Sequence, residues 1–174
     1  MKKLLILLLM ATTTISQAQD GKAETEKKTF SRTTSVSINI KADKSIIWTL
    51  MTQAHDIPRW NSTIISLEGK IEKGEKIKLK STVDSSRTFS LKVVSFTEEK
   101  EMVWSDGFAP FFKGVRTYTL TKNENGSCTF TMHEKLKGIT FPMAASSIPS
   151  FDESFEQFAK DLKIESEKIQ NTKD

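Results

Sequence analysis

Six segments with the alternating pattern of β-strands follow one another between residues 64 and 137, and this run constrains the fold more than any other feature. The segments are residues 64–71, 75–83, 88–97, 102–106, 115–122 and 129–137. Short turns separate them, at Lys73-Gly74 and at residues 84–86, 98–100 and 123–126. Strands joined by such short turns pair antiparallel, because parallel neighbours need long crossover connections. We therefore expect an antiparallel meander of six strands.

One further strand and two short helices are predicted before this run. Apolar side chains recur at every second position from Val36 to Ile40, which predicts a strand over residues 30–40 with one buried face. Asp43 is placed to cap a helix over residues 44–52. A second short helix is expected over residues 56–61, with Trp60 on its inner side.

A single long amphipathic helix is predicted near the C-terminus. The residues Ser150-Phe151-Asp152-Glu153 form a capping box, and Phe155, Phe158 and Leu162 continue one apolar face toward Lys168. Only this helix is available to cover the apolar face of the meander, so the sheet is expected to curl around it and to leave a cavity between them. The predicted fold is α+β: a curved, seven-stranded antiparallel sheet around a long C-terminal helix, with two short helices after the first strand.

The register of two hairpins follows from keeping apolar residues opposed, and it shows which side chains point inward. In the last hairpin this rule pairs Leu120 with Phe130, Tyr118 with Met132, and Arg116 with Glu134. In the hairpin around Ser85 it pairs Leu79 with Leu91, Ile77 with Val93, and Ser81 with Phe89. The apolar parity changes between Val93 and Val94, which indicates a β-bulge that helps the sheet to curve.

Several of these residues resemble a known family. Trp60-Asn61, Trp104, the stretch 112–116 and the stretch 133–138, ahead of a long terminal helix, look like the START-like helix-grip superfamily. The branch that they resemble is the polyketide cyclase/dehydrase and lipid-transport group, over residues 30–168. The resemblance implies a seven-stranded sheet wrapped around the C-terminal helix and a hydrophobic tunnel for lipids, hormones, polyketides or other apolar molecules. Such a fold serves both carriers and enzymes, so it does not choose between them.

The N-terminus has the pattern of a secretory signal peptide. Lys2 and Lys3 precede an apolar stretch over residues 4–10, and Ser16-Gln17-Ala18 offers small residues at the positions that a signal peptidase reads. We therefore expect cleavage after Ala18 and export to the periplasm or the medium. The expected division is a signal peptide at 1–18, a disordered lead-in at 19–29, one domain at 30–168 and a tail at 169–174.

Charge and chemistry exclude several classes of function. Without Lys2 and Lys3 the chain carries 24 basic and 22 acidic residues with no basic stripe, so nucleic acid is not an expected partner. The predicted outward direction of His133, and the lack of a suitable partner for His55, leave no acid–base pair and no metal site. Cys128 is the only cysteine, so no internal disulfide forms. We predict no catalytic residue, no metal and no cofactor.

The candidate ligand site combines inward-facing strand residues with aromatic loops. Phe108, Phe111 and Phe112, together with Phe141, Met143 and Ile148, form the expected mouth, although they would equally serve to cap the core. Arg116 and Glu134 are the only charges that the last hairpin sends inward, where they hold either a ligand's polar end or only each other. The complete predicted set is Trp60, Leu79, Phe89, Leu91, Trp104, Phe108, Phe111, Phe112, Arg116, Tyr118, Met132, Glu134, Phe141, Met143, Phe151 and Phe155.

Three functions are consistent with this set, and the oligomeric state is left open by the sequence. The first is a carrier or sensor of a small hydrophobic or amphipathic molecule, which is the function that we favour. The second is a cyclase or dehydratase that polarises a carbonyl with Arg116, Glu134 and Tyr118. The third is a module whose apolar loops contact a membrane or a partner protein.

Overall fold

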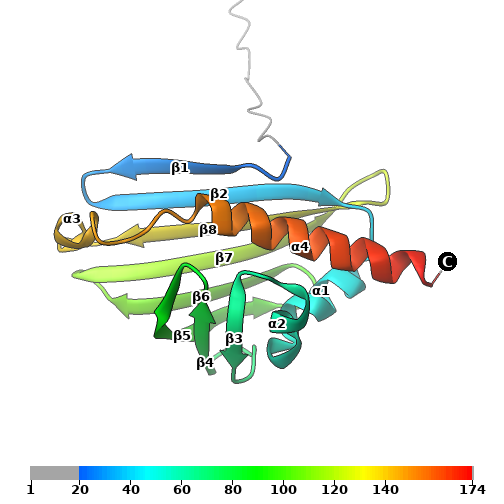
Figure 1. The fold of residues 1–174 in the computed structure, drawn as a ribbon, viewed down its shortest axis with the longest axis horizontal. Coiled ribbons are helices and arrows are strands. Elements are labelled where there is room, and N and C mark those ends of the chain that lie inside the picture. Colours follow the sequence, from blue (N-terminus) through cyan, green and yellow to red (C-terminus); the bar gives the residue numbers. More distant parts are fainter. Residues whose placement is uncertain (1–19, 174) are drawn as a thin grey trace, which may run out of the picture.

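The computed structural model describes residues 20–173 as one curved sheet with helices packed against it (Figure 1). The predicted signal peptide lies outside the described residues. The elements are β1 (Ala23–Lys28), β2 (Ser31–Ile40), α1 (Lys44–Thr52), a 3₁₀ turn (Ala54–Asp56), α2 (Ile57–Trp60), β3 (Ile64–Glu68), β4 (Lys76–Ser81), β5 (Asp84–Thr97), β6 (Glu101–Phe108), β7 (Phe112–Lys122), β8 (Cys128–Lys137), α3 (Phe141–Ala144) and α4 (Asp152–Asn171).

The sheet has the predicted antiparallel meander, closed by pairing of the first long strand with the last. Its order is β1-β2-β8-β7-β6-β5-β4-β3, and every pairing is antiparallel. Helix α4 lies across the concave side of the sheet and packs against β2, β1 and β8 (Figure 1). The α+β helix-grip fold expected from the sequence is therefore confirmed. Within residues 20–173, no helix is both long enough and apolar enough to cross a membrane.

Strand β1 corrects the prediction of a disordered lead-in and of seven strands. Residues 23–28 pair with β2 along their full length, so the sheet has eight strands. Thr25 donates a hydrogen bond to Asp152 of α4, and Glu156 of α4 accepts one from the backbone N–H of Ala23 at 3.1 Å. An edge strand held by backbone pairing and polar contacts needs no apolar alternation, and a polar sequence of this kind therefore carries no strand signal.

Helix α4 supplies the central apolar face, and Phe158 is its hub. The Phe158 ring lies 5.8 Å from Trp60, 6.1 Å from Tyr118 and 6.1 Å from Phe130, measured between ring centroids. Phe155, Ala159 and Leu162 are buried beside it. Burying three such large side chains, Phe155, Phe158 and Leu162, stabilises the fold by roughly 1.5–3 kcal/mol each.

Both ends of α4 differ from the prediction. The capping box does not form: Phe151 is the N-cap, no side chain caps it, and the Ser150 hydroxyl instead bonds the Asp152 carboxylate at 2.7 Å. At the other end the helix continues through the predicted tail to Asn171. Glu167 accepts the backbone N–H of Lys41 at 2.8 Å, and this contact ties the last turns of the helix to the connection after β2. Asp43 likewise precedes α1 without a capping hydrogen bond from its side chain.

The two predicted hairpin registers had different outcomes. The β7–β8 register is confirmed, including the pair of Arg116 with Glu134. The β4–β5 register was wrong by two residues, because the turn lies at 82–83 and not at 84–86; Leu79 pairs with Phe89, and Ile77 with Leu91. A shift of two positions keeps every side chain on its face, so the predicted inward set survives. The predicted bulge is confirmed as a register shift between Val93 and Ser95.

Candidate ligand-binding site

A cavity of about 170 Å³ lies between the concave face of the sheet and the first turns of α4. Its apolar wall comes from alternate residues of the central strands, which point to one face because strand side chains alternate. The segment before α4 and the helix itself complete the enclosure. Apolar residues of the wall include Ile64, Leu79, Phe89, Leu91, Trp104, Phe112, Met132, Leu136, Ile148, Phe151, Phe155 and Phe158.

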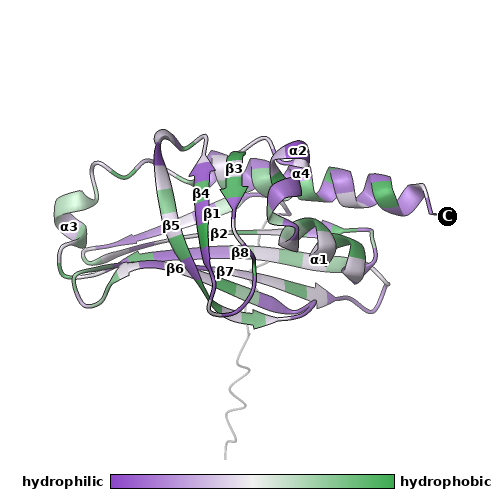
Figure 2. Cartoon of the chain, turned by 90° about the horizontal axis from the view of Figure 1, so that it is seen from below, coloured by the Kyte–Doolittle hydropathy of each residue, from purple (hydrophilic) through white to green (hydrophobic). Residues whose placement is uncertain are grey.

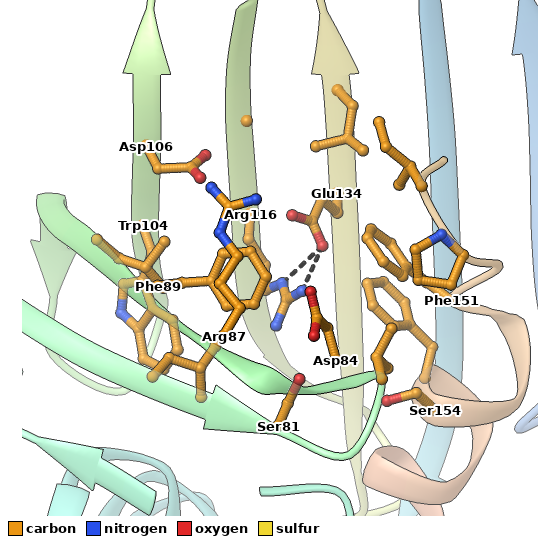
Figure 3. A pocket seen from close by; sticks show the side chains of 18 of the residues that line it. Ser81, Asp84, Arg87, Phe89, Trp104, Asp106, Arg116, Glu134, Phe151 and Ser154 are labelled. Carbon is orange, nitrogen blue, oxygen red and sulfur yellow. Dashed lines mark hydrogen bonds and ion pairs between the residues drawn. The ribbon is translucent and has the colours of Figure 1, made fainter. Parts of the chain in front are cut away.

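An ion pair between Arg116 and Glu134 lies in this wall (Figure 3). The Arg116 Nε donates to Glu134 Oε2 at 2.9 Å, and its Nη2 donates to the same oxygen. The two side chains are 19% and 12% exposed, so the pair is largely but not fully removed from water. Burial disfavours the arginine charge, but Glu134 and Tyr118 together outweigh this effect and raise the pKa of Arg116 above its usual value. Arg116 also lies over the Phe155 ring, 5.2 Å from its centroid.

Three further charged residues lie around this pair, and sequence reasoning missed all of them: Asp84, Arg87 and Asp106. Figure 3 shows them facing the same space from β5 and β6. Burial raises the pKa of Asp106, and the nearby Glu134 charge raises it further. Arg87 extends over the Phe89 ring, 4.6 Å from its centroid. Arg87 was missed because residues 84–86 were predicted to be a turn, whereas Asp106 shares the parity of Trp104 and could have been found.

Arg32 holds the segment that closes the cavity before α4. Its Nη1 and Nη2 donate to the carbonyl oxygens of Ile148 at 3.1 Å and Pro149 at 2.8 Å. Its guanidinium also lies 4.9 Å from the centroid of the Phe151 ring. Burial lowers the pKa of Arg32, although Glu134 and Asp152 oppose this effect. Arg32 has the same parity as Val36, so its inward direction was present in the sequence and was overlooked.

The structure brings ten of the sixteen predicted site residues to the cavity wall. They are Leu79, Phe89, Leu91, Trp104, Phe112, Arg116, Met132, Glu134, Phe151 and Phe155.

The other six predicted residues lie elsewhere. Trp60 and Tyr118 are buried in the core around Phe158, and Phe141 is buried against Phe112, with ring centroids 6.3 Å apart. The remaining three, Phe108, Phe111 and Met143, are exposed to solvent and do not close the cavity. Hydropathy identifies apolar loop residues, but it does not give the direction in which a loop side chain points.

The burial of Tyr118 bears on the carbonyl-polarising hypothesis. Tyr118 is 1% exposed, and its ring packs against Trp104 with centroids 4.8 Å apart, below the cavity wall. Burial raises the pKa of its hydroxyl, so the group remains protonated at neutral pH. Because Tyr118 does not reach the cavity, Arg116, Glu134 and Tyr118 do not converge on one accessible position. Within residues 20–173, no three His, Cys, Asp or Glu side chains are placed to hold a metal ion.

A curved antiparallel sheet gripping a C-terminal helix, with a cavity between them, defines the START-like helix-grip class of hydrophobic-ligand-binding folds. The chain belongs to the polyketide cyclase/dehydrase and lipid transport family, whose model matches residues 31–163. The match covers strands β2 to β8. Strand β1, at one edge of the sheet, lies outside it.

Solved structures share the fold at low sequence identity. A START superfamily protein from Mycobacterium smegmatis aligns with a TM-score of 0.58 and 15% identity, over 79% of this chain and 98% of that one. A point mutant of norcoclaurine synthase from Thalictrum flavum, in complex with a transition-state analogue, aligns with a TM-score of 0.62 and 13% identity. That alignment covers 86% of this chain and 100% of the synthase chain. Major latex-like protein 151 from Panax ginseng aligns with a TM-score of 0.59 and 16% identity, over 81% of this chain and 98% of that one. Comparison with curated proteins gave no match.

Proposed function

We propose that this chain binds a compact, mainly hydrophobic molecule that carries one polar group, and that it does so without transforming the molecule. The observation that carries the proposal is an apolar cavity of about 170 Å³ with one ion pair, Arg116–Glu134, in its wall. A wall of hydrophobic and aromatic side chains with a few placed polar groups is the usual composition of a small-molecule site. Family membership supports the same class of ligand.

The volume limits the size of the guest. Engineered protein cavities of about 150 Å³ hold benzene, and pockets for drug-sized ligands measure roughly 300–1,000 Å³. A cavity of about 170 Å³ therefore suits one ring or a short branched chain. A longer ligand fits only if part of it extends past Arg87 or past the segment 147–151 into solvent.

The charges of the wall select the polar group. Three carboxylates and two guanidinium groups border the cavity, so an anionic ligand meets no net positive charge. Both bonds from Arg116 end on Glu134 Oε2, which leaves Oε1 able to accept a hydrogen bond. Asp106, whose pKa is raised by burial, offers a further polar contact nearby. We therefore expect the ligand to present a hydrogen-bond donor, a hydroxyl or an amine, and not a carboxylate or phosphate.

Export is the second part of the proposal, supported by the signal-peptide pattern of residues 1–18. In the described part of the chain, the Asp20 carboxylate accepts the backbone N–H of Asn39 at 2.7 Å, and a chain that begins at Gln19 would keep this contact. Intact-mass measurement of the protein from its own source should give a chain that begins at Gln19. A chain that retains residues 1–18 refutes this part of the proposal.

The binding proposal is tested by native mass spectrometry of the protein purified from its own source, followed by extraction and identification of bound molecules. A Leu91→Trp variant fills the cavity and should lose the bound molecule. The matched control is Ile164→Trp, on the exposed face of α4, which should retain it. Equal retention by both variants would show that the molecule binds elsewhere. Conversion of the recovered molecule into another compound by the purified protein would indicate catalysis and contradict the proposal.

A further inference from the structure

One end of the molecule carries most of its exposed large hydrophobic side chains. Within residues 20–173, eight large hydrophobic residues are exposed, and five of them lie at this end. We call these five the apolar tip: Phe30 (57% exposed), Phe108 (71%), Phe111 (51%), Ile139 (58%) and Met143 (83%). The other three, Ile65, Val94 and Ile164, are scattered over different elements. A cluster of this kind marks an interaction surface, whereas scattered residues do not.

Backbone hydrogen bonds fix the apolar tip as one surface. Three connections meet there: β1–β2, β6–β7, and the segment from β8 through α3, all at the left end in Figure 1. The N–H of Gly138 donates to Phe30 at 3.1 Å, that of Ile139 to Pro110 at 3.0 Å, and that of Thr140 to Phe111 at 3.1 Å. Figure 2 shows apolar colouring on α3 at the same end. The exposed side chains are therefore presented together by joined loops.

The charged residues within the three stretches that carry the apolar tip are all basic. Residues 27–32, 107–113 and 135–150 contain six basic residues and no Asp or Glu. The rest of the chain after Ala18 carries 18 basic and 22 acidic residues, so positive charge is concentrated at this end. The basic residues are Lys27, Lys28, Arg32, Lys113, Lys135 and Lys137, of which Arg32 is buried.

Strand pairing aligns three of these lysines. Lys113 pairs with Lys137, Lys137 with Ser31, and Ser31 with Lys28, which makes one row across β7, β8, β2 and β1. Directly opposed residues share a face of the sheet, so the three side chains point the same way. Of the five lysines, four are exposed and Lys113 is half-buried; within the described residues, Lys28 alone of the five has an ion-pair partner, Glu26 at 3.0 Å. The row leaves positive charge available to an outside partner.

We propose that this end docks on an anionic lipid surface, with the apolar tip inserted among the headgroups and the lysine row on the lipid phosphates. Apolar side chains inserted at the interface, together with basic residues, give reversible attachment to membranes that contain anionic lipids. A second copy of this chain is a poorer partner, because a symmetric contact would place one lysine row close to the other. The proposal does not depend on the identity of a cavity ligand.

Docking in this orientation also sets the position of the cavity. Phe112, which lines the cavity, directly follows Phe111 of the apolar tip, and it stacks on the buried Phe141. The segment 147–151, which closes the cavity, follows α3 in the same connection. The closing segment would therefore lie near the lipid when the apolar tip is inserted.

Vesicle co-sedimentation tests the proposal with the chain from Gln19 onward. Vesicles of phosphatidylcholine alone should bind it weakly, and vesicles of equal parts phosphatidylcholine and phosphatidylglycerol strongly. Raising the salt from about 0.1 M to 1 M shortens the screening length from about 10 Å to about 3 Å and should release it. The double variant Lys113→Gln/Lys137→Gln should bind about 25-fold more weakly, at about fivefold per lysine, whereas Lys73→Gln/Lys100→Gln should bind as the wild type does.

A second pair of variants tests the apolar contribution. Phe108→Ser/Met143→Ser should lose most vesicle binding, while Ile65→Ser/Ile164→Ser, which removes exposed apolar residues outside the apolar tip, should not. All four sites are exposed, so the variants are expected to fold, and circular dichroism checks this. Equal binding to both vesicle types, or wild-type binding by Phe108→Ser/Met143→Ser, overturns the proposal. A dimer in solution that this variant abolishes, without vesicle binding by the wild type, also overturns it and assigns the surface to a second copy.

Discussion

Replacing Glu134 by leucine should destabilise the protein by about 3 kcal/mol, and additional removal of Arg116 should restore most of that loss. In the wild type, Glu134 accepts two hydrogen bonds from Arg116 in a wall where the side chains are 12% and 19% exposed. Breaking a buried pair by removing one partner typically costs about 3–5 kcal/mol, and the residual exposure places this pair at the lower end. Glu134→Leu leaves the Arg116 charge beside Phe155 without its counter-ion.

The double variant Arg116→Met/Glu134→Leu is the informative comparison. Well-packed apolar replacements of a buried ion pair are often neutral or stabilising, so the double variant should lie within about 1 kcal/mol of the wild type. The double-mutant cycle should then give a coupling energy of at least about 2 kcal/mol. Urea unfolding, followed by tryptophan fluorescence with Trp104 in the cavity wall as a reporter, measures the unfolding free energy of the wild type, the two single variants Arg116→Met and Glu134→Leu, and the double variant. Additive effects of the two single variants would refute the reasoning.

The same variants separate a structural role from a ligand role. If Arg116 and Glu134 serve only each other, the folded double variant should retain the molecule found with the wild type. If they also hold the ligand's polar group, the double variant should fold and lose the molecule. The binding proposal made above requires the second result, and native mass spectrometry distinguishes the two.

Three further predictions concern a carboxyl group, a glycine and the edge strand. Burial raises the folded pKa of Asp106 above 3.8, so the unfolding free energy of the wild type falls as pH rises through that folded pKa. Asp106→Asn should therefore gain stability relative to the wild type between about pH 4 and 7. Urea titrations at each pH measure this difference. Gly138→Ala should cost about 2 kcal/mol or more, since its Cβ would lie 1.9 Å from the Phe111 oxygen, whereas Gly126→Ala, with open space around it, should cost about 1 kcal/mol in the same assay. Deleting residues 19–29 should lower the melting temperature and promote association on size-exclusion chromatography, because β2 becomes an open edge; an unchanged monomer would contradict this.

The sequence predicted the parts of the fold that depend on apolar periodicity. The meander, α1, the bulge after Val93 and the opposition of Arg116 to Glu134 all follow from apolar residues that must share a face. The inward ion pair could be predicted because Tyr118 and Met132, next to it on the strands, set the register. Even a wrong turn position between β4 and β5 left the inward set intact, because the error was two residues.

The sequence did not reveal features that depend on polar contacts or on loop direction. Strand β1 carries no apolar alternation, and its partners Asp152 and Glu156 lie more than a hundred residues away. Phe108 and Met143 were assigned to the mouth of the cavity, although they point to solvent, because composition alone does not orient a loop. Arg32 carries a charge at an inward position, and apolar periodicity does not identify charged residues.

Arg32 ties the segment that closes the cavity to strand β2. The segment that it holds is not part of the sheet, so moving this segment outward breaks no strand pairing. Such a movement breaks two hydrogen bonds from one guanidinium group, whose Nε is already buried without a hydrogen-bond partner in the described part of the chain. Besides these two bonds, the stack of Phe151 on Phe155, with ring centroids 5.9 Å apart, holds the segment. We therefore expect a substitution at Arg32 to loosen the segment and to widen the range of accepted molecules while the sheet keeps its shape.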